Sequence, residues 1–352
     1  MKRPSRPNPR RRGPLWASLG LAAVLLAGCS QELPYNTLAP AGPVADEQRD
    51  LYMLVFWIAV GVFVLVEGAL VFAIFRFRRR SPDELPVQVH GNTRLEVIWT
   101  IIPALLLAGI AVPTVASIFK LSRIPDNALP ITVTAHQWWW EVEYPELGVV
   151  TSNEIHIPVG RPIYLELTSK DVIHSFWVPT LAGKQDMIPG RTENLVIQAD
   201  GPGTYLGQCM EYCGASHANM KFVVMAEPQS EFDAWAAGQR EAAAEPEADS
   251  DAAEGQEVFT NPLPQGPPPD SPFGACIGCH TIDGLGGGDV GPNLTHFGSR
   301  SVLAGGTLEN TPENLARWLA DPPGVKPGSK MPDYNLTDDQ IEDLVAFLET
   351  LE

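Results

Sequence analysis

The chain has 352 residues, which is long enough for two or three domains. It holds 42 acidic and 24 basic side chains, and the formal net charge is −18. Residues 1–28 carry six basic side chains and no acidic one, so the rest of the chain has a net charge of −24. This charge argues against nucleic acid as a partner and suits a basic soluble protein or plain solvation.

The first 28 residues have the pattern of an export signal. Basic side chains come first, and an apolar run over residues 15–27 follows that is too short to span a bilayer. Residues 26–29 read Leu-Ala-Gly-Cys, which resembles the bacterial lipobox, so we expect Cys29 to be lipidated. An uncleaved anchor or a chance cysteine is the alternative. Residues 29–47 are polar and contain proline, which predicts an extended tether.

Two apolar runs predict a transmembrane helical hairpin over residues 48–121. Residues 51–75 exceed the ~20 residues that a membrane helix needs and contain one charge, Glu67. Four arginines follow directly, which predicts that this end faces the cytoplasm, and residues 97–119 return the chain to the outside of a bacterial cell membrane. A carboxylate at membrane depth is costly without a partner, so Glu67 is a functional candidate or packs against another subunit.

Beyond the hairpin, residues 125–227 have the pattern of an all-β domain. Apolar and polar residues alternate over 131–134, 155–158, 163–167 and 195–197, with glycine and proline between these runs. Several short strands at this spacing predict a Greek-key sandwich or barrel. Ligand-binding side chains then belong on loops at one end of the scaffold.

Residues 208–220 hold the most informative motif. Cys209, Cys213, His217 and Met220 follow one another at spacings of four, four and three, and His174 lies upstream. Thiolate, imidazole and thioether ligands select copper, and two thiolates can bridge two copper ions that share one electron. Two cysteines in an exported chain also suit a disulfide, and two cysteines with two histidines suit structural zinc. Met220 has no role in either of these alternatives.

This stretch resembles the dinuclear copper A motif of subunit II of haem-copper cytochrome c oxidases, and the resemblance extends over about residues 45–227. It implies a cupredoxin-like domain in which Cys209 and Cys213 bridge the coppers. The remaining ligands implied by the resemblance are His174, His217, Met220 and the backbone carbonyl of Glu211. It further implies that the Glu211 carboxylate helps to hold a magnesium ion at the contact with subunit I.

Other residues receive expected roles from the same resemblance. Residues 90–103 resemble the family's segment before the second membrane helix, which implies that Glu96 stands at the mouth of a proton path. A solvated residue at a helix start is the alternative for Glu96. Residues 136–140 read His-Gln-Trp-Trp-Trp, and the resemblance implies that electrons enter at Trp138, whereas core packing is the alternative. Trp139 departs from the family's usual tyrosine. Asp186 and Arg191 match residues at the subunit I interface.

Residues 228–253 consist mostly of alanine and acidic residues and hold few large apolar side chains. A stretch of this composition predicts a linker, helical in part, that contributes to no core. It therefore separates two domains.

Residues 276–280 read Cys-Ile-Gly-Cys-His, which is the attachment signature of a c-type haem. Cys276 and Cys279 would form thioethers, and His280 would bind the iron. Met331 is the expected second iron ligand, a pairing that raises the haem potential, and His296 is its competitor. A redox-active dithiol is the alternative for the two cysteines.

The C-terminal part, over about residues 252–352, resembles class I cytochrome c, which implies an all-α domain expected over residues 254–352. Residues 291–294 read Gly-Pro-Asn-Leu, and the resemblance implies that the Pro292 carbonyl accepts the N–H of His280. A proline-rich insertion over residues 261–271 departs from the pattern. Thr311 and Thr337 have the sequence context of helix N-caps.

The sequence thus predicts a multidomain membrane protein with a helical hairpin, a cupredoxin-like domain and a cytochrome c domain. The resemblance implies the electron-delivery subunit of a caa-type oxidase, with one covalent haem c and dinuclear copper A. The expected partners are the haem-copper subunit I, subunit III, and a donor such as soluble cytochrome c or a quinol–cytochrome c reductase. The alternatives are a copper A-containing nitric oxide reductase and a free-standing membrane-anchored electron carrier or copper-delivery protein. A quinol oxidase is disfavoured because that branch lacks the copper cysteines.

Overall fold

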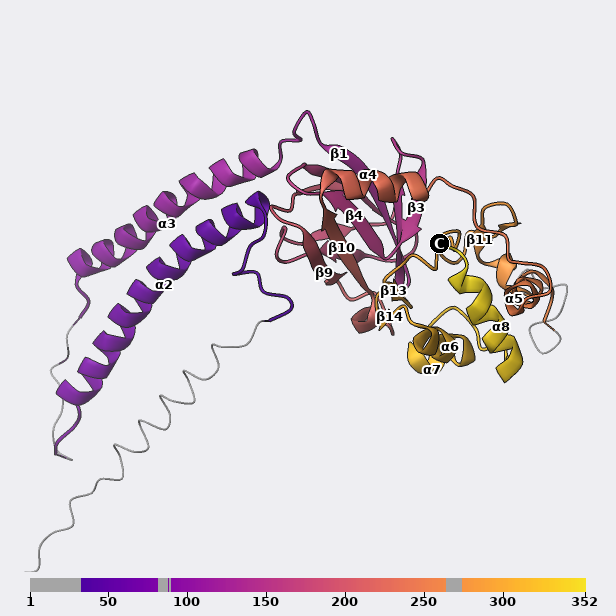
Figure 1. Cartoon of the computed structure of the whole chain (residues 1–352). Coiled ribbons are helices and arrows are strands. Elements are labelled where there is room, and N and C mark those ends of the chain that lie inside the picture. The colour runs from indigo at the N-terminus through magenta and orange to yellow at the C-terminus, as the bar shows by residue number, and fades with distance from the viewer. Residues whose placement is uncertain (1–32, 82–87, 89, 264–273) are drawn as a thin grey trace, which may run out of the picture.

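A computed structural model describes residues 33–81, 88, 90–263 and 274–352. The predicted signal peptide, Cys29 and residues 264–271 of the proline-rich insertion lie outside the described residues. Figure 1 shows two long helices that project from a β-rich domain, with a smaller helical domain on the opposite side. We call residues 129–227 the β-domain and residues 251–352 the C-terminal domain.

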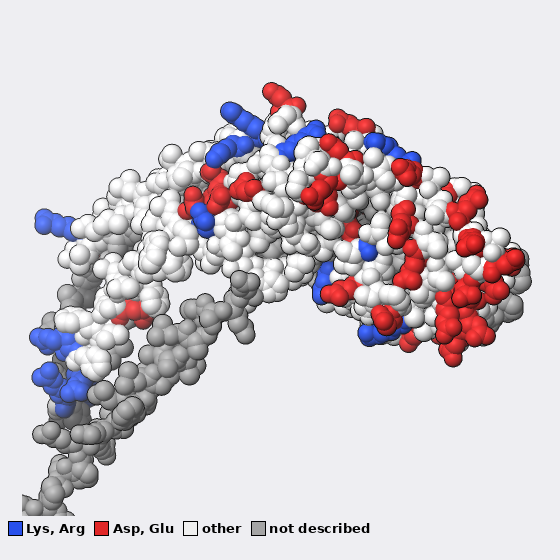
Figure 2. Space-filling view, in the orientation of Figure 1, with Lys and Arg blue, Asp and Glu red and all other residues white. Residues whose placement is uncertain are grey.

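The two projecting helices are α2, Pro43–Arg76, and α3, Thr93–Leu121. Both are long and apolar enough to cross a membrane. Their large apolar side chains are exposed nearly all round, which suits a lipid or protein environment and not water. Figure 2 shows basic side chains gathered at the end of the hairpin remote from the β-domain.

At the end near the β-domain, the two helices are tied together by polar side chains. The Glu47 carboxylate accepts a hydrogen bond from Ser117 at 2.5 Å and forms an ion pair with Lys120. The start of α3 is capped by Asn92, whose side chain accepts from the backbone N–H groups of Arg94 and Leu95. These contacts fix the start of α3 and hold the two helices together at the end near the β-domain.

The β-domain is a sandwich of two five-stranded sheets with strand orders β3-β2-β1-β5-β8 and β4-β10-β9-β6-β7. The pairs β1/β5 and β4/β10 are parallel, and the other neighbours are antiparallel. The four predicted strands are confirmed. The strands are β1 Leu129–His136, β2 Trp139–Tyr144, β3 Val149–Ser152, β4 Glu154–Pro158, β5 Ile163–Ser169, β6 His174–Trp177, β7 Gln185–Met187, β8 Glu193–Ile197, β9 Gly203–Cys209 and β10 Lys221–Glu227.

The core of the sandwich lies between the inner faces of these sheets. Alternate residues of β5 are buried, which is the signature of a strand with one face on a core. Trp140 is fully buried and contacts Phe176 and Phe222 edge-on, with ring centroids 6.0 and 5.0 Å away. The same aromatic cluster lies beside His174, whose ring centroid is 6.3 Å from that of Trp140.

The stretch expected to be a linker contributes to this core, contrary to the prediction. Residues Gln229–Gly238 form helix α4. Phe232 is buried in the β-domain core, and Trp235 stacks on His156 at a centroid distance of 4.1 Å. Two aromatic side chains three residues apart share one helix face, so a short segment of low overall hydrophobicity can still dock.

The C-terminal domain is helical, as predicted. Helix α5 crosses α8 so closely that a Cβ on Gly255 would lie 2.0 Å from the backbone oxygen of Asp343, so only glycine fits there. Thr337 forms the predicted capping box with Gln340. The elements are α5 Asp251–Thr260, η2 Cys276–Gly278, β11 Thr281–Ile282, β12 Gly286–Gly287, β13 Val302–Leu303, β14 Leu308–Glu309, α6 Pro312–Ala320, α7 Pro322–Val325 and α8 Asp338–Glu349.

Truncating Leu165, which is fully buried in β5, tests this account of the core. We expect Leu165→Ala to lower the free energy of unfolding by about 2–5 kcal/mol, because it removes apolar contacts and leaves a cavity. Val150→Ala is the control, since Val150 is 41% exposed and should change stability by about 0.5 kcal/mol or less. Urea unfolding of the full chain in detergent, followed by near-UV circular dichroism, measures both. Equal losses would contradict the sandwich core.

Candidate functional site

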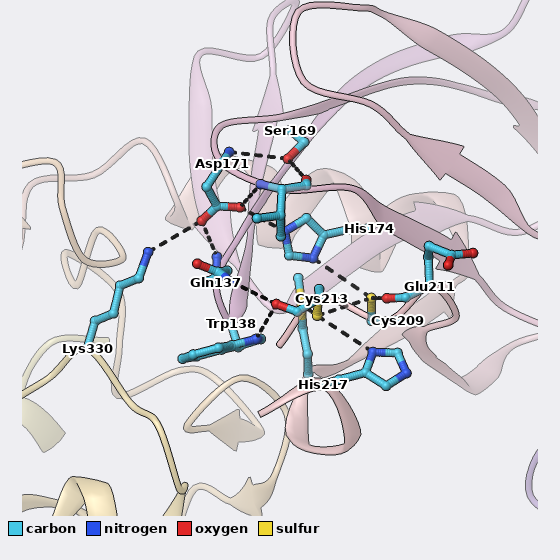
Figure 3. Close-up of polar contacts among 12 residues, drawn as sticks. Gln137, Trp138, Ser169, Asp171, His174, Cys209, Glu211, Cys213, His217 and Lys330 are labelled. Atoms are coloured by element: carbon cyan, nitrogen blue, oxygen red, sulfur yellow. Dashed lines mark hydrogen bonds and ion pairs between the residues drawn. The ribbon is translucent and has the colours of Figure 1, made fainter. Parts of the chain in front are cut away.

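The predicted copper ligands converge at one end of the β-domain. The sulfur atoms of Cys209 and Cys213 lie 3.8 Å apart. His174 Nδ1 lies 3.8 Å from the Cys209 sulfur, and His217 Nδ1 lies 3.6 Å from that of Cys213. The Met220 sulfur is 3.8 Å from the Cys213 sulfur. Figure 3 shows His174 and His217 on two sides of the cysteine pair.

Rigid strands hold these side chains in place. His174 begins β6, Cys209 ends β9, and Met220 directly precedes β10, so three ligands sit where strands of the same sheet meet the loops. The short helix η1, His217–Asn219, turns the chain between Cys213 and β10. The Glu211 carbonyl lies 3.3 Å from the Cys209 sulfur.

The two thiols are electrostatically coupled. The hydrogen bond with Cys213 lowers the pKa of Cys209 to about 3, and the same contact raises the pKa of Cys213. Without a cation, a negative charge on one of these buried sulfurs opposes ionisation of the other. A second thiolate requires positive charge between them, which two copper ions would supply.

Asp171 orients His174. Its Oδ1 lies 2.9 Å from His174 Nε2, so the opposite ring nitrogen, Nδ1, is directed toward Cys209. Burial opposes ionisation of this carboxylate, but hydrogen bonds from His174 and the backbone N–H groups of Gln137 and Val172 lower its pKa overall. A carboxylate behind a metal-binding histidine fixes the ring and makes it a better ligand.

Two further side chains hold the Cys213 end of the site. The Cys213 carbonyl accepts hydrogen bonds from Gln137 Nε2 at 2.7 Å and from the Trp138 indole at 3.1 Å. Sequence reasoning assigned no role to Asp171 or Gln137. The position of Asp171 three residues before His174 was the signal for the first, whereas the role of Gln137 depends on a contact across 76 residues.

The donor set therefore fits a dinuclear copper centre. The described residues place His174, Cys209 and Cys213 within 4.8 Å of one another, and all three are buried. Met220 is fully buried and directed at Cys213, a contact that neither a zinc site nor a disulfide uses. The sulfur separation of 3.8 Å is also well beyond that of a disulfide bond.

The haem motif lines a cavity that lies between the C-terminal domain and the β-domain, because Trp138 and Ser152 also line it. Cys276, Cys279, His280 and Met331 all face this cavity. His280 Nδ1 lies 2.9 Å from the Pro292 carbonyl, which leaves Nε2 for a metal, and burial lowers the pKa of His280 and favours the neutral ring that a metal needs.

The lining of the cavity fits a haem. The guanidinium of Arg300 is buried at its edge, and its Nε has no hydrogen-bond partner among the described residues. The negative charge of a haem propionate would balance the positive charge of this guanidinium. His296, the competing iron ligand, does not line this cavity, and its Nδ1 lies 2.9 Å from the backbone oxygen of Glu352.

Other predicted residues lie apart from both sites. Glu96 is exposed in the first turn of α3, and Glu67 lines a groove between α2 and α3. Asp186 pairs with Lys184 at 2.9 Å, and Lys184 also lies 3.4 Å from the Glu211 carboxylate. Arg191 pairs with Glu193.

Three family models match the chain. The model described as the periplasmic domain of cytochrome c oxidase subunit II matches residues 149–227, and that of its transmembrane domain matches residues 35–116. The cytochrome c model matches residues 252–352.

Similar proteins match nearly the whole chain. Cytochrome c oxidase subunit 2 of Alkalihalophilus pseudofirmus is 40% identical over 342 residues, which is 95% of both chains. The protein of that name from Bacillus sp. is 38% identical over 96% of this chain and 97% of its own. Quinol oxidase subunit 2 of Bacillus cereus is 34% identical over 60% of this chain and 75% of its own. The solved periplasmic domain of cytochrome oxidase subunit II of Bradyrhizobium japonicum is 30% identical, with a TM-score of 0.33, and covers 34% of this chain and 97% of that one.

Cysteine substitutions should separate the two sites. We expect Cys213→Ser to abolish the electron paramagnetic resonance pattern of one electron shared by two copper nuclei, because one bridging thiolate is gone, and to leave covalent haem intact. The double change Cys276→Ser and Cys279→Ser should do the reverse. Spectra, metal analysis and a haem assay on the same samples measure this. A shared-electron signal in Cys213→Ser would overturn the assignment.

Removing the carboxylate behind His174 should weaken the copper site without removing a ligand. We expect Asp171→Ala to lower copper affinity about 10- to 100-fold, with Asp171→Asn in between. Asp200→Ala, at an exposed position of the same domain, is the control. Competition with a copper chelator gives the affinities. Equal affinity in the Asp171→Ala and Asp200→Ala variants would show that His174 is oriented by other contacts.

Proposed function

Because the chain belongs to the cytochrome c oxidase subunit II family and carries a cytochrome c domain, we propose that it is the electron-input subunit of a caa-type cytochrome c oxidase. It is a membrane-anchored subunit of an oxidase. In the proposed route, an external donor reduces the C-terminal domain, and electrons continue through the β-domain to the haem-copper subunit, where dioxygen reduction drives proton translocation.

One observation carries this proposal: Trp138 touches both candidate sites. Its indole donates to the carbonyl of Cys213, and its side chain also lines the haem cavity together with Met331. A single aromatic side chain thus joins the C-terminal domain to the copper loop. This arrangement favours Trp138 as the residue through which electrons reach the β-domain.

The chain's own residues position the two redox groups. When bound, the haem and the dinuclear copper would supply one-electron carriers. His280 and Met331, which both line the cavity, would hold the iron, with His280 oriented by Pro292. Two copper ions would be held by Cys209 and Cys213, together with His174, His217, Met220 and the Glu211 carbonyl. The rigid strands behind them limit rearrangement when an electron arrives.

The remaining details of the proposal depend on partner subunits. Glu96 would stand at the cytoplasmic mouth of a proton path, since the arginines that follow α2 mark that end of the hairpin. Both redox domains would then lie outside the cell membrane. The Glu211 carboxylate, now beside Lys184, would contribute to a magnesium site only on contact with subunit I. Subunit III and a soluble cytochrome or quinol–cytochrome c reductase complete the proposed partners.

The oxidase complex itself tests this function. We expect a tagged chain, extracted from its membranes in mild detergent, to bring with it a large haem-containing membrane subunit and to consume dioxygen with a reduced donor. Trp138→Leu should slow this uptake and leave both metal spectra intact. Trp177→Leu is the control, because Trp177 stacks on Tyr35 and does not line the haem cavity.

Two outcomes would overturn the proposal. Consumption of nitric oxide in place of dioxygen would return the chain to the reductase alternative. A chain that carries both metals but purifies without a partner membrane subunit would be a free-standing electron carrier.

A further inference from the structure

The C-terminal domain contacts the β-domain along a buried polar interface that we call the seam. Its residues exchange hydrogen bonds between the two domains. They are Trp138, Ser152 and Glu154 of the β-domain and Arg300, Ser301, Val302 and Lys326 of the C-terminal domain.

Glu154 is the central acceptor of the seam. One of its carboxylate oxygens accepts from the Ser301 backbone N–H at 2.6 Å, the Ser301 hydroxyl at 2.6 Å and the Val302 backbone N–H at 2.9 Å. The other oxygen lies 3.6 Å from His156. The side chain is only 2% exposed, so its charge depends on His156 of its own domain and on these donors from the C-terminal domain.

Arg300 joins the two domains beside Glu154. Its Nη1 donates to the Ser152 hydroxyl at 2.8 Å, and its Nη2 donates to the Asn293 carbonyl within its own domain at 2.5 Å. A guanidinium held on both sides of an interface fixes orientation as well as contact, because its donors lie in one plane.

Lys326 forms a hydrogen bond with the backbone of Trp138, the residue that touches both the copper site and the haem cavity. Its Nζ donates to the Trp138 carbonyl at 2.6 Å and to the Ala304 carbonyl at 2.8 Å, and the residue is 4% exposed. Burial lowers the pKa of Lys326 to about 7. Either an ammonium or an amine can donate both bonds, so the contact persists across neutral pH.

Close backbone contacts flank Lys326 next to the copper loop. The Lys221 N–H donates to the Gly305 carbonyl at 2.8 Å, and the Ser216 hydroxyl donates to the Pro327 carbonyl at 2.5 Å. A Cβ on Gly328 would lie 2.7 Å from that of Ala215 and 3.3 Å from the Trp138 ring. The C-terminal domain therefore covers part of the Trp138 side chain with its own backbone.

Most basic side chains of residues 274–352 also contact the β-domain. Residues 274–352 contain four basic side chains, and three of them contact the β-domain: Arg300 and Lys326 in the seam, and Lys330, which lies 3.5 Å from Asp171. Only Arg317 does not, and Figure 2 shows that acidic side chains dominate the visible surface of this domain. Beside the seam, Lys330 and Asp171 form an ion pair between the two domains, and another orientation of the C-terminal domain would break it.

We propose that Glu154 and Lys326 are positioning residues that hold the C-terminal domain in one orientation, so that Trp138 receives electrons from the chain's own haem and not directly from an external carrier. This inference rests on the proposed electron-input function. It adds that the C-terminal domain stays docked on the β-domain during electron transfer and does not move away on its linker.

The test uses the full chain in detergent, loaded with copper and haem, and the double variant Glu154→Leu with Lys326→Met. The Lys221 amide reports docking, because it donates a hydrogen bond across the domains to the Gly305 carbonyl. Neither Lys221 nor Gly305 is substituted in the double variant. We expect its hydrogen–deuterium exchange, resolved by mass spectrometry with fragmentation, to accelerate about 10- to 100-fold, since two buried hydrogen-bonding groups are lost. Unchanged exchange would overturn the proposal.

A second readout follows the electron. After photoreduction of the haem, we expect its reoxidation by the copper site in the original chain to be independent of solvent viscosity. In the double variant it should be slower and viscosity-dependent, because the domain must dock again before transfer. A loosened Lys221 amide with an unchanged rate would show that docking does not position the haem, and would also overturn the proposal.

Matched variants isolate the seam. Glu143→Leu with Arg317→Met removes the same charges from exposed positions of the same two domains, and should leave both readouts unchanged. Glu154→Gln keeps an acceptor oxygen for Ser301 and Val302, and should stay close to the original chain. The haem absorbance and the copper spectrum show that each variant is folded and loaded. If the original chain lacked the haem absorbance or the copper spectrum, the proposed function would be wrong. If the double variant had both signals and an unchanged exchange rate at the Lys221 amide, only this inference would be wrong.

Discussion

Two buried sulfur atoms 3.8 Å apart impose the constraint on which the rest of this structure depends. Both can be thiolates only if positive charge lies between them. The pair therefore favours soft metal ions, which bind thiolate ligands. The end of a β-sandwich satisfies this constraint well, because strands β6, β9 and β10 hold the surrounding ligands on a rigid frame. Asp171, Gln137 and Trp138 then fix the histidine and the cysteine carbonyl from behind.

The C-terminal domain meets the β-domain beside the copper loop, at Trp138. Trp138 binds the copper loop through its indole, lines the haem cavity with its side chain, and accepts from Lys326 through its carbonyl. One residue therefore serves the copper site, the haem site and the contact between them. Since a covalently linked partner is present at a high effective concentration, a modest seam is enough to keep the two sites together.

Much of the site could be predicted from the sequence because its chemistry is local. Cys209, Cys213, His217 and Met220 fall within 12 residues, and the haem motif spans five. The expected strands and helix caps were also confirmed, since alternation and capping depend on near neighbours. The role of residues 229–238 was predicted wrongly. Their composition indicated a linker, but Phe232 and Trp235 share one helix face and find an apolar surface on the β-domain.

Residue spacing and hydrophobic period in the sequence by themselves determined the candidate ligands, the hairpin and the all-β class of the first domain, and the resemblance to class I cytochrome c implied the all-α class of the second. Only the tertiary structure decided how the domains meet. Glu154 and Ser301 lie 147 residues apart, and Lys326 and Trp138 lie 188 apart. No periodicity links such positions, and a buried carboxylate or lysine resembles any surface charge until the fold removes it from water. The seam is therefore a property of the folded chain.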